Sequence, residues 1–248
     1  MHKKTVYEIT GNEPLTHDTW RMRLQGDTSA FTAAGQFVNA AIDGLYLRRP
    51  LSVCALDEGA LTLVYKVVGK GTLAMSRMTA GGRLDLLTGL GNGFTPEKSS
   101  RKALLAGGGV GTAPLYELAR RLKASGTEVQ AVLGFNTAAD IILREEFEAL
   151  GVRVHTATVD GSEGTHGFVT QIMPELDFDY VYCCGPLPMM RAVCEASACS
   201  GQYSFEERMG CGFGICMGCT CNTAGGAKRV CKEGPVFHKE EILWQTLR

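Results

Sequence analysis

Four cysteines near the end of the chain are the residues best suited to chemistry: Cys211, Cys216, Cys219 and Cys231. Their spacing is C-x4-C-x2-C-x11-C, and glycines lie between the first three. Glycine reaches backbone conformations with positive φ, which a loop needs when it wraps its backbone around a bound group. The run 210–221, GCGFGICMGCTC, therefore predicts a metal-binding loop rather than a packed element.

Three kinds of site could use these cysteines. The first three have the spacing of plant-type [2Fe–2S] centres, which four cysteine thiolates hold. A structural zinc site usually combines two C-x2-C pairs or adds histidine, but this segment has one such pair, and the nearest downstream histidine is His238. A disulfide pair is the third alternative. The spacing favours the [2Fe–2S] cluster, and an electron carrier needs a group with which to exchange electrons.

Composition narrows the class of protein. The 248 residues are 45% hydrophobic and 21% charged, which predicts a folded chain with a substantial core. The net charge of −1 argues against a nucleic-acid partner. We expect no secretory leader, because the start lacks an apolar region, and no membrane span, because no run of about 18 apolar residues occurs. Ten cysteines in such a chain predict reduced thiols or metal ligands, and hence a cytoplasmic protein.

The elements predicted from the sequence change character along the chain. Residues 1–97 predict an antiparallel β-barrel, because apolar and polar residues alternate in short runs at 5–11, 19–24, 36–42, 61–68 and 83–90, with one helix at 71–78. Residues 98–207 alternate strands with helices at 112–126, 144–151 and 187–200, which predicts a parallel α/β domain. Residues 208–248 form the cluster segment. The fold class is thus α/β plus β.

Three motifs in the first two parts could position further chemistry. AGGGVGTAPL (106–115) lies between a strand and a helix, where glycines let the backbone approach a pyrophosphate, although an ordinary glycine turn also fits. CCGPLPMM (183–190) places Cys184 at a strand end, where α/β sheets bind ligands; a buried cysteine is the alternative. In RRPLSV (48–53), Arg48 and Arg49 leave a strand on opposite faces, and one of them could hold a phosphate.

Together these motifs resemble a known family. A barrel with RxxS, then GGGVGTAP, then CGPxxM is similar to the layout of the ferredoxin–NADP reductase superfamily over about residues 1–205. The stretches SFEERMGCGFGICMGCTC (204–221) and RVCKEGPVF (229–237), with GKGT (69–72), resemble the electron-transfer subunits of type B dihydroorotate dehydrogenase.

The resemblance implies the cofactors and the residues that bind them. It implies FAD in the barrel, with Arg49 neutralising the pyrophosphate and Ser52 near the reactive edge of the ring. The implied FAD residues are Arg49, Pro50, Leu51, Ser52, Lys66, Val67, Val68, Gly71 and Thr72. It implies NAD(H) near Gly109, Gly111, Thr112, Cys184 and Gly185. The implied cluster ligands are Cys211, Cys216, Cys219 and Cys231, which leaves Cys221 as a bystander.

The resemblance also implies a function. The chain would shuttle electrons between NAD(H), FAD and the cluster to a catalytic flavoprotein partner in a hetero-oligomer of pyrimidine biosynthesis. NAD rather than NADP is expected, because the residues after the second strand (134–143) carry Asp140 and no basic side chain. Alternatives are reductase subunits of bifurcating transhydrogenases, sulfhydrogenases or sulfite reductases, and a zinc-stabilised binding module.

Overall fold

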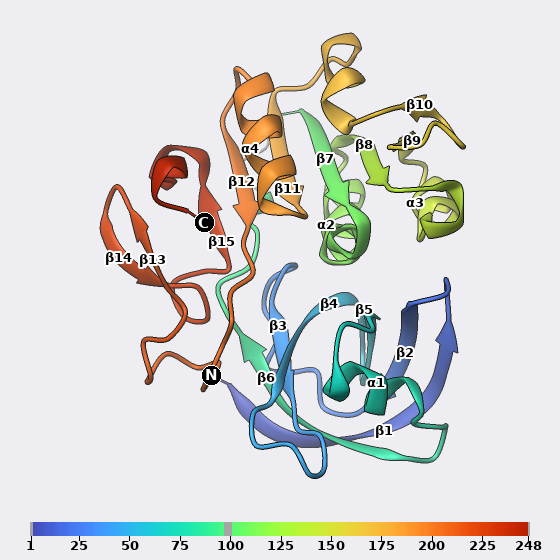
Figure 1. The fold of residues 1–248 in the computed structure, drawn as a ribbon, viewed down its shortest axis with the longest axis vertical. Helices are drawn as coiled ribbons and strands as arrows, with labels where there is room; N and C mark the ends of the chain where they lie inside the picture. The colour runs from blue at the N-terminus through green and yellow to red at the C-terminus, as the bar shows by residue number, and fades with distance from the viewer. Residues whose placement is uncertain (1, 97–100, 248) are drawn as a thin grey trace.

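The structure, a computed structural model, describes residues 2–96 and 101–247. A barrel forms the lower half of the molecule in Figure 1, an α/β domain forms the upper half, and the C-terminal part runs along one side of both. In the described part of the chain, no helix is long and apolar enough to span a membrane.

The N-terminal part, up to the end of β6, forms the predicted antiparallel barrel. Its six strands close in the order β1-β2-β5-β4-β3-β6. They are β1 (Lys3–Pro14), β2 (Thr19–Gln25), β3 (Phe37–Ala40), β4 (Arg49–Asp57), β5 (Ala60–Lys66) and β6 (Arg83–Leu90), and the helix α1 (Lys70–Ser76) follows β5. Every second residue of β6 is buried, which is the alternation that a barrel strand needs to fill its interior.

The middle of the chain forms a sheet with crossover helices, as predicted. The parallel strands are β7 (Lys102–Gly108), β8 (Glu128–Phe135), β9 (Arg153–Thr158), β10 (Thr165–His166), β11 (Tyr180–Cys184) and β12 (Gly201–Ser204). The helices are α2 (Ala113–Ala124), α3 (Arg144–Ala149) and α4 (Leu187–Ala196). The strands lie in the order β10-β9-β8-β7-β11-β12-β15. The chain adds β8, β9 and β10 on one side of β7 and then β11 and β12 on the other side, so the strand order reverses between β7 and β11. An open parallel sheet binds ligands at such a point. Short 3-10 turns lie at Gly109–Thr112, Ala138–Asp140, Val169–Gln171, Met173–Glu175, Lys239–Glu241 and Trp244–Thr246.

The C-terminal part joins both halves. A hairpin of β13 (Thr220–Thr223) and β14 (Gly226–Arg229) projects from the side, and β15 (Val236–His238) pairs antiparallel with β12 as the edge strand of the sheet. The sequence did not predict that this part would return to the sheet. The division into residues 98–207 and 208–248 stays a prediction, and the boundary between residues 97 and 98 lies outside the described residues.

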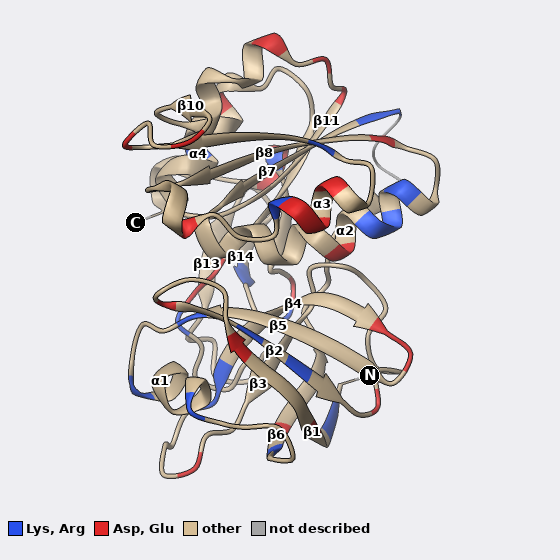
Figure 2. Ribbon diagram, turned by 90° about the vertical axis from the view of Figure 1, so that its right-hand side faces the viewer, with Lys and Arg blue, Asp and Glu red and all other residues tan. Residues whose placement is uncertain are grey.

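A buried carboxylate clamps the α/β domain to the barrel. Glu117 of α2 is 5% exposed and accepts hydrogen bonds from the backbone N–H of Leu56 (3.1 Å), from Arg120 (3.0 Å) and from Arg121 (3.0 Å). Arg120 also reaches Asp57 of the barrel at 2.8 Å. Charged residues of both signs gather on α2 and α3, the helices that lie next to the barrel (Figure 2). The relative placement of the two halves therefore depends on Glu117.

Glu117→Ala is expected to lower the free energy of unfolding by about 3 kcal/mol, because a buried N–H and two partly buried guanidinium groups lose their acceptor. In a chain of this size, that loss lowers the midpoint of thermal unfolding by roughly 6–12 °C, which calorimetry measures. Glu148→Ala removes an exposed carboxylate on α3 and should change stability by less than about 0.5 kcal/mol. Equal midpoints for the two variants would contradict the role given to Glu117.

Candidate functional site

The four predicted cluster cysteines meet where the C-terminal part crosses the barrel. Cys219 and Cys231 are each 3% exposed and pack with Phe37 of β3, whereas Cys216 is exposed. The eleven residues between Cys219 and Cys231 are mostly the hairpin β13–β14, which returns the chain so that the N–H of Cys231 lies 3.4 Å from the Cys219 sulfur. The hairpin thus accounts for the long spacing in the motif, because it brings Cys231 back beside Cys219.

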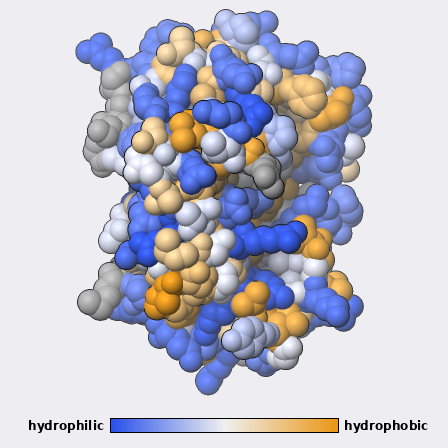
Figure 3. Space-filling model, turned by 60° about the vertical axis from the view of Figure 1, so that its left-hand side comes forward, coloured by the Kyte–Doolittle hydropathy of each residue, from blue (hydrophilic) through white to orange (hydrophobic). Residues whose placement is uncertain are grey.

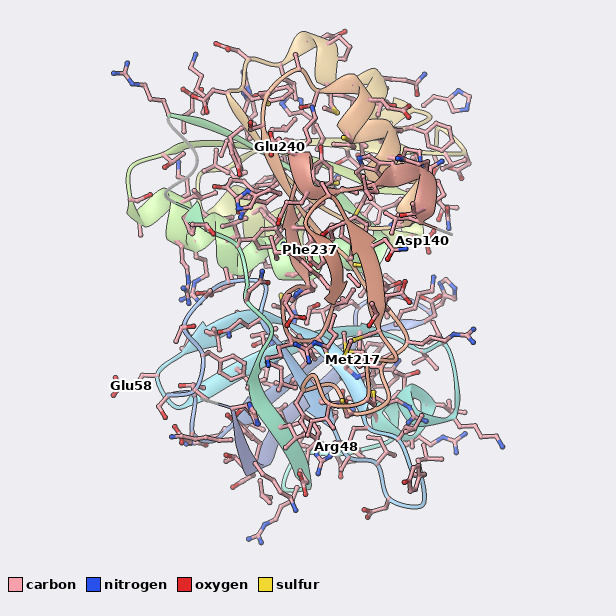
Figure 4. The ribbon with its side chains drawn as sticks, turned by 90° about the vertical axis from the view of Figure 1, so that its left-hand side faces the viewer. Arg48, Glu58, Asp140, Met217, Phe237 and Glu240 are labelled. Atoms are coloured by element: carbon pink, nitrogen blue, oxygen red, sulfur yellow. The ribbon has the colours of Figure 1, made fainter. Side chains whose placement is uncertain are left out.

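The thiols form two pairs. The sulfur of Cys211 accepts hydrogen bonds from the backbone N–H groups of Ile215 (3.3 Å) and Cys216 (3.4 Å), and the Cys216 thiol bonds to it as well. Cys231 is hydrogen-bonded to the thiol of Cys219. Figure 4 shows Met217 on this loop, where sulfur atoms gather, between Phe237 above it and Arg48 of the barrel below it.

The surroundings of the two pairs differ. Partial burial acts to raise the pKa of the Cys211 thiol, but the N–H groups of Cys216, Phe213 and Ile215 outweigh it and lower the pKa to about 6. Burial and the neighbouring Cys219 thiol raise the pKa of Cys231 to about 12. In the outer pair, Cys211 and Cys216, backbone N–H groups therefore stabilise the Cys211 thiolate. The inner pair, Cys219 and Cys231, lies in apolar surroundings.

Two neighbouring pairs of thiols supply the four sulfur donors that a two-iron cluster needs. A [2Fe–2S] cluster needs four thiolates spread over two irons, and N–H groups directed at the sulfurs tune its potential. Cys221 lies on β13 and lines a small cavity with Phe205 and Phe237, and its role as a bystander stays a prediction.

The two adjacent arginines have different partners. Arg48 forms an ion pair with Asp85 at 2.9 Å and donates to the backbone oxygen of Asn39 at 3.1 Å. Arg49 lies against Gly71 at the start of α1, where any Cβ would collide with the guanidinium group. Of the two, Arg49 lies beside the start of α1, and its role at the flavin pyrophosphate stays a prediction.

The other predicted FAD residues lie on the segments that lead to and from α1. Lys66 ends β5 and pairs with Asp18 at 2.9 Å. Val67 donates its backbone N–H to the Asp18 backbone oxygen at 2.7 Å, and the Val68 side chain is exposed. The hydroxyl of Thr72 accepts the N–H of Val68 at 3.0 Å, so it caps the helix start.

The strand β4 carries Pro50, Leu51 and Ser52. Leu51 packs against the barrel core, while Ser52 lies opposite Phe37 in the register of β3 and β4. Phe37 in turn packs against Cys219 and Cys231. The predicted flavin strand and the inner thiol pair are therefore separated by a single strand.

The predicted nucleotide residues meet at the reversal point of the sheet. Gly109, Gly111 and Thr112 lie in the turn after β7, Cys184 is the last residue of β11, and Gly185 follows it. A Cβ on Gly111 would lie 2.6 Å from the backbone oxygen of Cys184 and 2.7 Å from the Cα of Gly185. Thr112 is fully buried, and its hydroxyl has no hydrogen-bond partner among the described residues. The site has a backbone cradle and a spare buried hydroxyl, both of which suit a dinucleotide.

Sequence reasoning missed two residues beside Cys184. Burial raises the pKa of the Cys184 thiol to about 12, with Glu206 adding to the rise and a hydrogen bond to Ser204 opposing it. Ser204 pairs with Cys184 in the register of β11 and β12. Because the carboxyl ends of parallel strands meet at one edge, the end of β12 could have been included in the predicted site.

The charged residues in the segment after β8 suit the ribose of NAD, which has a free 2′-hydroxyl, better than the 2′-phosphate of NADP. Asp140 caps its own turn by accepting two hydrogen bonds from Thr137, each 3.1 Å long. A cleft of about 300 Å³ opens there between the barrel and the α/β domain. Two arginines line the cleft, and both are ion-paired, Arg21 with Glu146 and Arg144 with Glu163.

Comparisons with known proteins agree with this geometry. The family "Iron-sulfur cluster binding domain of dihydroorotate dehydrogenase B" matches residues 206–243, and "Oxidoreductase NAD-binding domain" matches residues 104–195. The chain is 46% identical to a dihydroorotate dehydrogenase B (NAD(+)) electron transfer subunit of Bacillus caldolyticus, covering 95% of this chain and 96% of that protein. It is 40% identical to the corresponding subunit of Geobacillus sp. (strain WCH70), covering 98% and 100%.

A solved structure also matches over nearly the whole chain. It belongs to an NADH-dependent reduced ferredoxin–NADP oxidoreductase described in terms of flavin-based electron bifurcation. The TM-score is 0.88 at 31% identity, covering 96% of this chain and 90% of that one. The fold and the order of its parts are therefore shared with flavin-dependent reductases.

Proposed function

The chain belongs to the family of dihydroorotate dehydrogenase B electron transfer subunits, and we propose that it relays electrons between NAD(H) and a catalytic dihydroorotate dehydrogenase partner through FAD and a [2Fe–2S] cluster. The observation that carries this proposal is the family match over residues 206–243, which includes all four clustered cysteines. Residues 1–97 serve as the flavin domain, 98–207 as the nucleotide domain and 208–248 as the cluster segment.

The protein's part in this function is to bind and orient its cofactors. When bound, the flavin exchanges electron pairs as hydride and the cluster exchanges single electrons. Arg49 neutralises the flavin pyrophosphate, and Ser52 hydrogen-bonds near the reactive edge of the ring. Cys211, Cys216, Cys219 and Cys231 hold the cluster. The contact of Phe37 with both β4 and the inner thiols supports a short distance between the two cofactors.

NAD(H) binds at the reversal point of the sheet. Gly109 and Gly111 let the backbone approach the pyrophosphate, and the buried hydroxyl of Thr112 offers it a hydrogen bond. Cys184 and Gly185 border the nicotinamide. NAD is preferred to NADP because the arginines of the neighbouring cleft already have carboxylate partners.

The catalytic partner docks over the outer thiol pair. Ile215 and Met217 of the cluster loop are 75% and 52% exposed, and hydrophobic patches lie among hydrophilic ones on this side of the molecule (Figure 3). Exposed apolar side chains next to a redox centre suit an interface across which electrons pass. Dihydroorotate and orotate interconvert on the partner, and in pyrimidine biosynthesis the electrons flow from dihydroorotate toward NAD. The six cysteines outside the cluster set are free thiols, which supports a reducing, cytoplasmic location for this hetero-oligomer.

A subunit of an electron-bifurcating reductase is the second candidate, because one solved structure of that kind matches at a TM-score of 0.88. The higher identity of 46% to the dihydroorotate dehydrogenase B subunit favours the first candidate.

Reconstitution separates the two candidates. The purified chain loaded with FAD, iron and sulfide should oxidise NADH with an artificial acceptor and leave orotate untouched. Adding a catalytic dihydroorotate dehydrogenase B subunit should couple dihydroorotate oxidation to NAD reduction. Turnover of dihydroorotate by the isolated chain, or no coupling in the assembled complex, would refute the proposed division of labour.

A further inference from the structure

The strand β3 has two different faces. Val38 and Ala40 point into the barrel and belong to its core. Phe37 packs under the cluster segment with Cys219 and Cys231, and Asn39, two residues further along, bonds to the same segment. The outer face of this barrel strand is therefore the surface against which the C-terminal segment packs, including the cluster loop (residues 210–221).

Asn39 is a polar residue on that outer face of β3. Its side-chain Nδ2 donates to the backbone oxygen of Cys211 at 3.1 Å, and the residue is 1% exposed. Gly212 (φ +78°) lies so close that a Cβ there would collide with the amide nitrogen. The side-chain oxygen Oδ1 is buried and has no hydrogen-bond partner among the described residues. A buried polar atom without a partner is costly, so the position is better explained by a specific role than by packing.

The same residue lies next to the proposed flavin strand. Asn39 is opposite Pro50 in the register of β3 and β4, two pairs along from Phe37 and Ser52 and so on the same face of the strands. Directly opposed residues of antiparallel strands share a face and are separated by one strand spacing, about 4.8 Å. Asn39 thus contacts the cluster loop from a position beside the strand proposed to hold the flavin.

The hydrogen bond to Cys211 acts on the outer thiol pair. The Cys211 sulfur accepts the N–H groups of Ile215 and Cys216, and such bonds raise the reduction potential of a cluster by stabilising its more negative reduced state. Those bonds need the Cys211 peptide to stay in place. The amide of Asn39 holds the carbonyl of that peptide.

Resting on the function proposed above, we propose that Asn39 is a positioning residue that sets the reduction potential of the cluster and the rate of electron transfer between cluster and flavin. It acts through the Cys211 peptide and touches neither a reacting atom nor the substrate.

The test compares two amide-to-carboxylate changes. Asn39→Asp replaces the donor by an acceptor that faces the Cys211 carbonyl. Asn92→Asp is the matched control, because Asn92 also ties the barrel to the C-terminal part, through its Nδ2 to the backbone oxygens of Glu233 (3.0 Å) and Val236 (2.7 Å). Both changes loosen the attachment of the segment, and only the first acts on the cluster loop.

An EPR-monitored redox titration and stopped-flow reduction by NADH provide the measurements. Asn39→Asp should move the cluster potential to a more negative value and slow cluster reduction at least tenfold, with flavin reduction by NADH unchanged. Asn92→Asp should lower thermal stability and leave the potential and the rate at wild-type values. Asn39→Ser, which is smaller and neutral, should give a smaller shift in the same direction if Asn39→Asp loads poorly.

Two results would overturn the inference: a wild-type potential in both Asn39 variants, or an equal shift in Asn92→Asp. A wild-type chain that binds flavin but never gives a cluster signal would instead refute the proposed function, and with it the inference.

Discussion

Cys219→Ser is expected to abolish electron delivery to the catalytic partner while NADH oxidation with a flavin-directed artificial acceptor continues. Cys219 is buried beside Phe37 and Leu90, and its thiol pairs with Cys231. A serine hydroxyl fills nearly the same space but does not ionise to replace a thiolate, so the fold persists and the cluster is lost. Transfer to the partner should fall by at least roughly a thousandfold, which corresponds to about 4 kcal/mol of activation free energy.

Cys221→Ser is the matched control for this prediction. Cys221 lies two residues further along, in β13, where it lines a small cavity together with Phe205 and Phe237. The control should keep the visible and EPR spectra of the cluster and the rate of transfer to the partner. Loss of the cluster in Cys221→Ser with retention in Cys219→Ser would show that the ligand set had been assigned wrongly.

The sequence predicted those features that depend on residues close together in the chain. Alternating runs predicted the barrel, and the helix predicted at 112–126 is observed as α2, Ala113–Ala124. The first three cysteines lie within nine residues, so their spacing alone indicated a cluster loop. Local chemistry decides features of this kind, and the family resemblance added the cofactors.

Contacts between residues distant in the chain decide what the sequence could not show. Adjacent Arg48 and Arg49 look equivalent until Asp85, on another strand, takes Arg48 as its partner. Nothing near Asn39 in the chain indicates its bond to Cys211, which is 172 residues away. The pairing of β15 with β12 likewise depends on tertiary packing and not on local sequence. The partners of Arg48 and Asn39 can be identified only from the folded structure, because packing brings them together.

Gly111→Ala is expected to reduce kcat/KM for NADH about a hundredfold, because displacing reacting groups by about 1 Å costs that much. The added Cβ would lie 2.6 Å from the backbone oxygen of Cys184 and 2.7 Å from the Cα of Gly185. Both contacts are with backbone atoms, so the clash cannot be relieved by the rotation of a side chain. The turn after β7 must then move away from the end of β11, which widens the point where the dinucleotide binds.

The site of this change confines its effect to one step. Gly111 lies in the α/β domain, whereas the proposed flavin and cluster residues lie on the barrel and the C-terminal part, so both cofactor spectra should be those of the wild type. Gly225→Ala is the control, because its Cβ would meet only side-chain atoms, the nearest at 3.7 Å. Steady-state NADH oxidation with an artificial acceptor measures both variants. If Gly111→Ala kept wild-type kcat/KM, or lost its flavin as well, hydride exchange would have to occur somewhere other than the contact between these two strand ends.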